Sequence, residues 1–180
     1  MNKAMIKSVV VLLVICLVIS GLLAVINSFT APVISAGAEE RAAAARQVVM
    51  PDAATFEEVP EAETSDVTAV YKGLDASGNV VGYVFTSLDG GFGGNITVMT
   101  GIDAEGYITK CQALDLTAET ATLGGQWANE EHTDKYIGLD EAGVAQAWTN
   151  GDIVISGSTI TSSAFEDSVN KAFAVFNTLQ

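Results

Sequence analysis

Ser8–Ile26 reads SVVVLLVICLVISGLLAVI, an unbroken apolar run near the start of a 180-residue chain. Its 19 residues would form a helix of about 28 Å, close to the hydrocarbon thickness of a bilayer. No charged residue occurs from residue 8 to residue 38, and a buried helix of a soluble domain rarely lacks a polar face over such a length. We therefore expect a transmembrane helix over residues 8–26.

A cleaved signal peptide is the main alternative for this run. Ala36-Gly37-Ala38 has the A-x-A form of a cleavage site but lies twelve residues beyond the run, further than such sites usually lie, and the run is long for a signal peptide. We therefore expect a retained anchor. Basic residues that flank an anchor stay in the cytoplasm, so Lys3 and Lys7 place residues 1–7 there and the rest of the chain in the periplasm or outside the cell.

The charge and the residue counts exclude several classes of protein. The chain has 8 basic and 22 acidic residues, a net charge of −14, whereas nucleic-acid binding needs clustered Lys and Arg. We therefore expect no nucleic-acid partner. One histidine, His132, and two cysteines argue against a Cys/His zinc site, a disulfide scaffold and a serine–histidine triad. Cys16 lies in the apolar run, so we expect Cys111 to be a reduced core thiol.

The remaining sequence predicts an extension, a connector and one domain. Residues 27–66 are expected to form a helical extension that ends at Pro51 and then an acidic connector, and the domain proper covers residues 67–180. Alternating apolar residues and turn signals predict four strands, at Val67–Gly73, Asn79–Ser87, Asn95–Ile102 and Tyr107–Leu114. Successive hairpins imply an antiparallel sheet.

The last third of the chain predicts helices. We expect short helices over residues 123–150, a fifth short strand at Asp152–Ile155 and a C-terminal helix. Ser163 and Glu166 have the spacing of a capping box at the start of that helix. One face of it repeats apolar residues at helical spacing, namely Phe165, Val169, Ala172, Phe173 and Phe176. The predicted fold class is therefore α+β, an antiparallel sheet with a C-terminal helix behind one transmembrane helix.

Three segments have the composition of a ligand site. Gly90–Gly94 (GGFGG) would let backbone approach a ligand closely, although alone it is most simply a flexible hairpin loop. Glu119–Gly125 (ETATLGG) is a polar loop after a strand. Ile155–Ser163 (ISGSTITSS) leads from an extended segment into a helix N-terminus, where free N–H groups and the helix dipole favour an anion. Its plainest interpretation is a Ser/Thr helix cap.

The same segments, with one more after the anchor, resemble a known family. Asn27–Pro32 (NSFTAP) resembles an N-x-x-T-x-P stretch, and Gly91–Ile96 followed by Gly101-Ile102-Asp103 resembles G-[YF]-G-G-x-I…G-I-D. Glu119–Gly124 resembles an E-T-P-G-L-G loop, and Ser156–Ser162 (SGSTITS) resembles the flavinylation signature S-G-A-T-x-T-S. In this order they resemble the G subunit of Rnf electron-transport complexes and, more distantly, the C subunit of the sodium-pumping quinone reductase. Both are membrane-anchored FMN-binding domains.

This resemblance implies a cofactor and its site over residues 67–180. In that family a threonine hydroxyl carries FMN through a phosphoester bond that a separate flavin transferase makes outside the cytoplasm, and the matching residue here is Thr159. The rest of the signature implies cofactor contacts at Ser156, Gly157, Ser158 and Thr161, and the loop implies ring contacts at Glu119, Thr120, Leu123 and Gly124. No catalytic side chain and no metal are implied, since the redox chemistry belongs to the flavin.

The sequence departs from the family pattern in both motifs. Ser158 replaces the usual alanine of the signature, and Ile153 stands where an aspartate is common. In the loop, Ala121 and Thr122 replace the proline and the first glycine, and Thr117 replaces a frequent histidine. The threonine that would accept the flavin is retained.

The implied function is that of an electron-relay subunit in a membrane complex that oxidises ferredoxin, reduces NAD⁺ and moves Na⁺ or H⁺. Its implied partners are the other Rnf membrane subunits, particularly RnfD, which is the second flavinylated one, and RnfA and RnfE, together with the flavin transferase and membrane lipid. Two alternatives stay open. One is a stand-alone membrane-anchored flavoprotein for extracytoplasmic electron transfer, and the other is a non-catalytic extracytoplasmic adaptor whose Ser/Thr turn only caps the last helix.

Overall fold

The computed structural model describes residues 3–180. They form two compact units, one up to Arg41 and one over Ala42–Gln180. The first helix, α1 (Lys3–Val49), supplies all the described residues of the first unit and the first residues of the second.

The part of α1 in the first unit is long and apolar enough to cross a membrane. From Lys7 onward it contains a stretch with a mean hydropathy of 3.4, and none of that stretch is buried by other parts of the chain. Two polar side chains just past the apolar run bond to the backbone of the same helix: Ser28 Oγ donates to the carbonyl of Val25 at 2.7 Å, and Thr30 Oγ1 donates to that of Ile26 at 3.1 Å.

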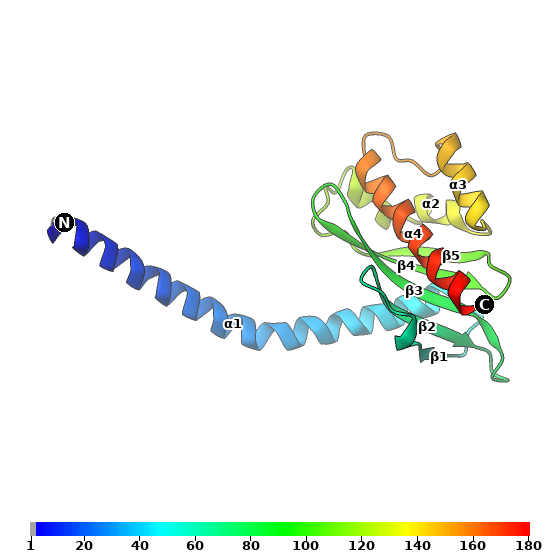
Figure 1. Ribbon diagram of the computed structural model, residues 1–180, viewed down its shortest axis with the longest axis horizontal. Coiled ribbons are helices and arrows are strands. Elements are labelled where there is room, and N and C mark those ends of the chain that lie inside the picture. The colour runs from blue at the N-terminus through cyan, green and yellow to red at the C-terminus, as the bar shows by residue number, and fades with distance from the viewer. Residues whose placement is uncertain (1–2) are drawn as a thin grey trace. The chain divides into compact units, whose positions relative to one another are not determined.

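The second unit is built on one antiparallel sheet with the strand order β1-β2-β3-β4-β5 (Figure 1). Each strand pairs with the next one along the chain, so every connection is a hairpin or a short loop. The strands are β1 (Thr55–Glu58), β2 (Val67–Leu74), β3 (Val80–Gly90), β4 (Asn95–Asp103) and β5 (Ile108–Asp115).

Helices cover both faces of this sheet. Successive side chains of a strand point to opposite faces, and Val84 and Phe85 on β3 are both fully buried. Phe85 belongs to the core beneath α4 (Thr159–Leu179), which packs mainly on β3 and β4. Val84 belongs to a second core that contains Ala45 and Val49 from the end of α1. The last turns of α1 therefore form part of the domain.

The structure confirms the α+β class, the four predicted strands and the C-terminal helix. The prediction of a strand at Asp152–Ile155 was wrong, because these residues form turn and coil. The amide of Ile155 donates to Ser162 Oγ at 3.1 Å instead of joining a sheet. The fifth strand is β1, within the segment expected to be a connector, where Thr55 pairs with Leu74 of β2.

The predicted start of the C-terminal helix was also wrong. Helix α4 begins at Thr159, with Ser158 at the N-cap position, so Ser163 lies in its second turn rather than at its start. Ser163 Oγ donates to Asp167 at 3.4 Å, and Glu166 accepts a bond from Asn170 at 2.6 Å. A Ser-x-x-Glu spacing also puts both residues on one face inside a helix, which explains the false signal.

Short helices connect β5 to α4, as predicted for residues 123–150. They are η2 (Gly124–Ala128), α2 (Glu130–Thr133), η3 (Asp134–Tyr136) and α3 (Glu141–Asn150), and one further turn, η1 (Pro60–Ala62), follows β1. The predicted apolar face of α4 is buried, and on it the ring of Phe165 stacks on Trp127 with centroids 4.3 Å apart and planes 16° apart. This stack joins η2 to α4, the two elements that border the site described next.

Candidate functional site

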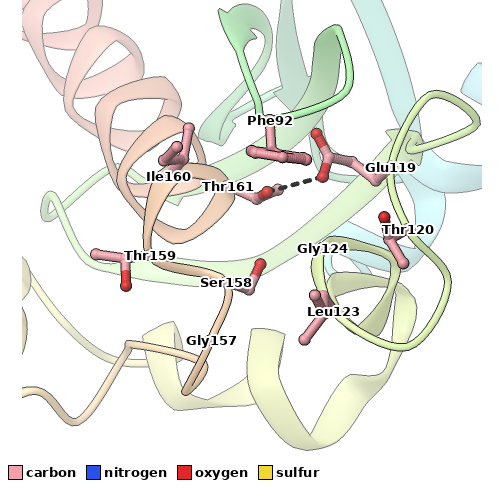
Figure 2. A pocket seen from close by; sticks show the side chains of 10 residues that line it. All are labelled: Phe92, Glu119, Thr120, Leu123, Gly124, Gly157, Ser158, Thr159, Ile160 and Thr161. Atoms are coloured by element: carbon pink, nitrogen blue, oxygen red, sulfur yellow. Dashed lines mark hydrogen bonds between the residues drawn. The ribbon is translucent and has the colours of Figure 1, made fainter.

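A cavity of about 280 Å³ lies at the N-terminus of α4. Three segments that are far apart in the sequence line it, namely the β3–β4 loop, the loop between β5 and η2, and the turn into α4 (Figure 2). The lining residues are Phe92, Glu119, Thr120, Leu123, Gly124, Gly157, Ser158, Thr159, Ile160 and Thr161. The three segments that the sequence singled out therefore meet at one place.

The carboxylate of Glu119 joins these three segments. Its Oε1 accepts a hydrogen bond from the amide of Gly93 at 3.0 Å, and its Oε2 accepts one from Thr161 Oγ1 at 2.8 Å. Hydrogen bonds to an ionised group are stronger than those between neutral groups. One side chain thus fixes the β3–β4 loop and the first turn of α4 to the loop that carries it.

Two glycines allow this close approach. A Cβ on Gly93 would overlap the backbone carbonyl of Ala118, and a Cβ on Gly124 would overlap the Glu119 carboxylate and lie 2.8 Å from Thr161 Oγ1. Only glycine lets the backbone come this close. The Gly-rich loop is therefore packed against the neighbouring loop, and it is more than a flexible hairpin.

The N-terminus of α4 opens onto the cavity. Ser158 occupies the N-cap position, but its side chain makes no capping bond to the helix. Its hydroxyl is buried and, among the groups of residues 3–180, has no hydrogen-bond partner. Figure 2 shows this hydroxyl directed between Thr161 and Leu123. The amide donors of the first turn lack a side-chain acceptor and, with the helix dipole, favour a bound anion.

Thr159 is the first residue of α4 and its side chain is exposed. Gly157, with a φ of 82°, makes the turn that places Thr159 at the head of the helix. A positive φ strains any residue with a Cβ. The Thr159 hydroxyl is therefore accessible to another macromolecule, next to donors that favour a phosphate.

Three large apolar side chains border the cavity. Phe92, Ile160 and Leu123 are 70%, 55% and 42% exposed, and each comes from a different one of the three segments. Exposed apolar groups around a concave site are typical of ligand pockets. The site thus combines an anion-binding end with an apolar rim, which suits a ligand that has a phosphate and a flat apolar ring.

Eight of the nine site residues predicted from the sequence line this cavity; Ser156 does not, and lies exposed in the turn before Gly157. That the eight hold a cofactor stays a prediction. Two lining residues, Phe92 and Ile160, were missed as contacts. Phe92 is the aromatic residue of the Gly-rich motif, so its position between glycines was the available signal. Nothing in the sequence pattern distinguished Ile160 from a core residue.

Comparison with known proteins agrees with this geometry. Residues 1–49 match the RnfG N-terminal region, and residues 91–174 match the FMN-binding domain, a range that contains every lining residue of the cavity. The chain is 33% identical to the G subunit of the ion-translocating oxidoreductase complex of Methanosarcina acetivorans over 177 residues, which cover 95% of this chain and 94% of the relative. The chain belongs to the RnfG family.

A second member of the family has a more specific name. The chain is 34% identical to the G subunit of the Na⁺-translocating ferredoxin:NAD⁺ oxidoreductase complex of Acetobacterium woodii over 197 aligned positions, and the alignment covers 98% of this chain and 94% of that relative. Both relatives are thus matched over nearly their whole length, anchor included. The resemblance to the Rnf G subunits is confirmed, and the chain contains an FMN-binding domain.

The residues of the cavity suit FMN. The buried, unpartnered hydroxyl of Ser158 and the uncapped N-terminus of α4 offer donors to a phosphate. The apolar rim suits the isoalloxazine ring, and the volume of about 280 Å³ is near the lower limit of small-molecule sites, roughly 300 Å³. A ligand the size of FMN would therefore fill the cavity and extend beyond it.

Proposed function

We propose that this chain is the electron-relay subunit of an Rnf-type complex and carries FMN as a phosphoester on Thr159 Oγ1. The observation that carries the proposal is the exposed Thr159 hydroxyl at the head of an uncapped helix, beside a cavity with an apolar rim. When bound, FMN supplies the capacity to accept electrons and pass them on.

The side chains of the site position and solvate the cofactor. The amide groups at the start of α4 hold the phosphate negative charge, and the hydroxyl of Ser158 donates to a ligand oxygen. Glu119 holds the walls of the site together through Gly93 and Thr161. In this proposal Gly157, Thr120, Leu123 and Gly124 supply the remaining contacts, and Ser156 stays outside the cavity lining.

The names of the two relatives suggest in which kind of complex this chain works. Both carry names of complex subunits, and one is named for ferredoxin:NAD⁺ oxidoreduction with Na⁺ translocation. We place this chain in a complex of that kind, which oxidises ferredoxin, reduces NAD⁺ and moves Na⁺ or H⁺. Its partners would be the other membrane subunits, particularly RnfD, RnfA and RnfE, with lipid around α1 and a flavin transferase during maturation. The single span would have a cytoplasmic N-terminus and the domain on the opposite side.

In-gel flavin fluorescence tests the attachment site. The full chain is co-expressed with a flavin transferase that is active on a known substrate, denatured in detergent, and run beside Thr159→Ala and Thr149→Ala. Thr149 is likewise an exposed threonine but lies in α3 and is not part of the cavity lining, so it is the matched control. We expect a fluorescent band in the parent and in Thr149→Ala, and none in Thr159→Ala. A fluorescent Thr159→Ala band, or a dark parent, would contradict covalent attachment at Thr159.

The two alternatives make different predictions. A helix-capping role does not account for Ser158, because its side chain makes no capping bond, and an adaptor would never acquire flavin. A stand-alone flavoprotein would acquire flavin but would be isolated from native membranes without the other subunits. Affinity purification of the tagged chain from its own membranes separates this case from the complex, which should retain them.

A further inference from the structure

Phe92 is the most exposed large apolar side chain of the cavity lining. It is 70% exposed, and it lies at the tip of the β3–β4 loop, between Gly91 and Gly93. An aromatic ring in water forgoes the stabilisation that burial gives. A ligand or partner that covered the ring would therefore gain this stabilisation.

The loop is held so that this ring faces the cavity. The amide of Gly93 donates to Glu119 Oε1 at 3.0 Å, and the amide of Gly91 donates to the carbonyl of Gly94 at 2.8 Å. A Cβ at Gly93 would overlap the carbonyl of Ala118. Backbone on both sides of Phe92 is thus fixed, and Figure 2 shows the ring on the side of the cavity opposite Leu123.

We propose that Phe92 stacks on the isoalloxazine ring of the FMN attached at Thr159. This inference rests on the proposed function and adds a ring contact that the sequence did not predict. Aromatic rings attract one another in offset-stacked and edge-to-face arrangements. Phe92 and Leu123 would then enclose the flavin from two sides, while Thr159 holds its phosphate. A partner protein that covers Phe92 instead is the rival occupant, and the experiment below separates the two.

Substitution of Phe92 by tryptophan makes the contact visible. An indole ring stacked on a flavin gives a charge-transfer absorption at wavelengths beyond the flavin band. It also quenches flavin emission, because it passes an electron to the excited ring and takes it back. Phenylalanine is too hard to oxidise to do either. The full chain, loaded by the transferase, is compared with Phe92→Trp and with the control Tyr107→Trp. Tyr107 is also exposed but lies in the β4–β5 hairpin, at the other end of β4.

We expect the long-wavelength absorption in Phe92→Trp alone, with loss of most of the flavin emission that the parent shows. Trp127 and Trp148 are common to all three proteins and cancel in the comparison. A loaded Phe92→Trp protein with the same absorption as Tyr107→Trp would overturn the inference and favour a partner protein as the occupant. If Phe92→Trp is not loaded, Phe92→Tyr is used with the same readout, since a phenol is also an electron donor. If the denatured parent carries no flavin, the proposed function itself is wrong.

Discussion

Thr161 Oγ1 donates a hydrogen bond to Glu119 Oε2 at 2.8 Å, across 42 positions of sequence. Thr161 is 1% exposed and Glu119 is half-buried, so this partly buried bond connects the first turn of α4 to the loop after β5. The second oxygen of the same carboxylate holds the β3–β4 loop through Gly93. The geometry of the site therefore depends on one carboxylate with two partners.

Removal of the Thr161 hydroxyl should destabilise the domain. Thr161→Val keeps the shape of the side chain but leaves Glu119 Oε2 without this donor. We expect the free energy of unfolding to fall by about 1 to 3 kcal/mol. Urea unfolding of the full chain in detergent, followed by tryptophan fluorescence, measures this change. Thr149→Val removes an exposed hydroxyl that bonds within α3 and should have little effect, and equal losses in both variants would contradict the assignment.

Two glycines near the β3–β4 turn, Gly90 at the end of β3 and Gly93 in the loop, should respond differently to alanine. A Cβ at Gly93 would overlap the carbonyl of Ala118, whereas a Cβ at Gly90 would have no heavy atom within 4 Å. Gly93→Ala should therefore push the loop away from Glu119 and cost about 1 to 3 kcal/mol. Gly90→Ala should change stability by less than about 0.5 kcal/mol. The same unfolding assay decides, and a neutral Gly93→Ala would show that the loop is not fixed there.

Alanine substitution of two phenylalanines should distinguish a residue of the core from a residue of the site. Phe165 is fully buried against Trp127, while Phe92 is exposed. Phe165→Ala should lower the free energy of unfolding by about 3 to 5 kcal/mol, because it removes buried area and leaves a cavity. Phe92→Ala in the flavin-free chain should change it by less than about 0.5 kcal/mol. A large loss in Phe92→Ala would mean that this ring supports the fold itself.

Glu166 should make the domain less stable as the pH rises. Burial raises the pKa of this carboxyl above its ordinary value of 4.5, opposed in part by the bond from Asn170. Well below pH 4.5 the group is neutral in both states. Above it the unfolded chain ionises first, so stability falls until the folded pKa is passed.

Glu166→Gln should therefore raise the melting temperature at neutral pH, and the gain should fade as the pH falls well below 4.5. Thermal unfolding across this range measures it. Glu131→Gln, which removes an exposed carboxylate, is the control and should leave the pH dependence unchanged. A gain that is the same at every pH would exclude ionisation of Glu166 as its cause.

The Cys111 thiol should be unreactive in the folded protein. It is buried against Thr100, and burial raises its pKa from 9.0 to about 12, which lowers the thiolate fraction about a thousandfold at mildly alkaline pH. In a Cys16→Ser background, maleimide should label Cys111 only after denaturation. Ser77→Cys in the exposed β2–β3 turn is the positive control, and rapid labelling of native Cys111 would show that this part of the core opens.

Much of the fold could be predicted because its signals are local. The hairpin turns carry Asp75 and Asp103, whose carboxylates accept bonds from the turn amides, and the strands beside them alternate. Strand β1 has no such signal, since Thr55–Glu58 is short and mostly exposed and becomes a strand only by pairing with β2. Ile153 and Ile155 are apolar residues two positions apart, as in a strand. In the structure both are buried, but in turn and coil.

The site could be predicted as a set of segments but not as a geometry. The motifs named most of the lining, because each is a short run of adjacent residues. The role of Glu119 could not be read from them, since its two partners lie 26 and 42 positions away. The exposure of Phe92 likewise depends on how the β3–β4 loop folds against Ala118.

The end of α1 has a consequence for release from the membrane. Ala45 and Val49 fill the face of the sheet that carries Val84 and Met99, and they belong to the same helix as the apolar span. A protease that cuts before Ala42 would shed a complete domain. A cut a few residues later would strip a helix from the sheet and leave Val84 and Met99 open to water. The last two turns of α1 thus separate the cleavage sites that release a folded domain from those that unfold it.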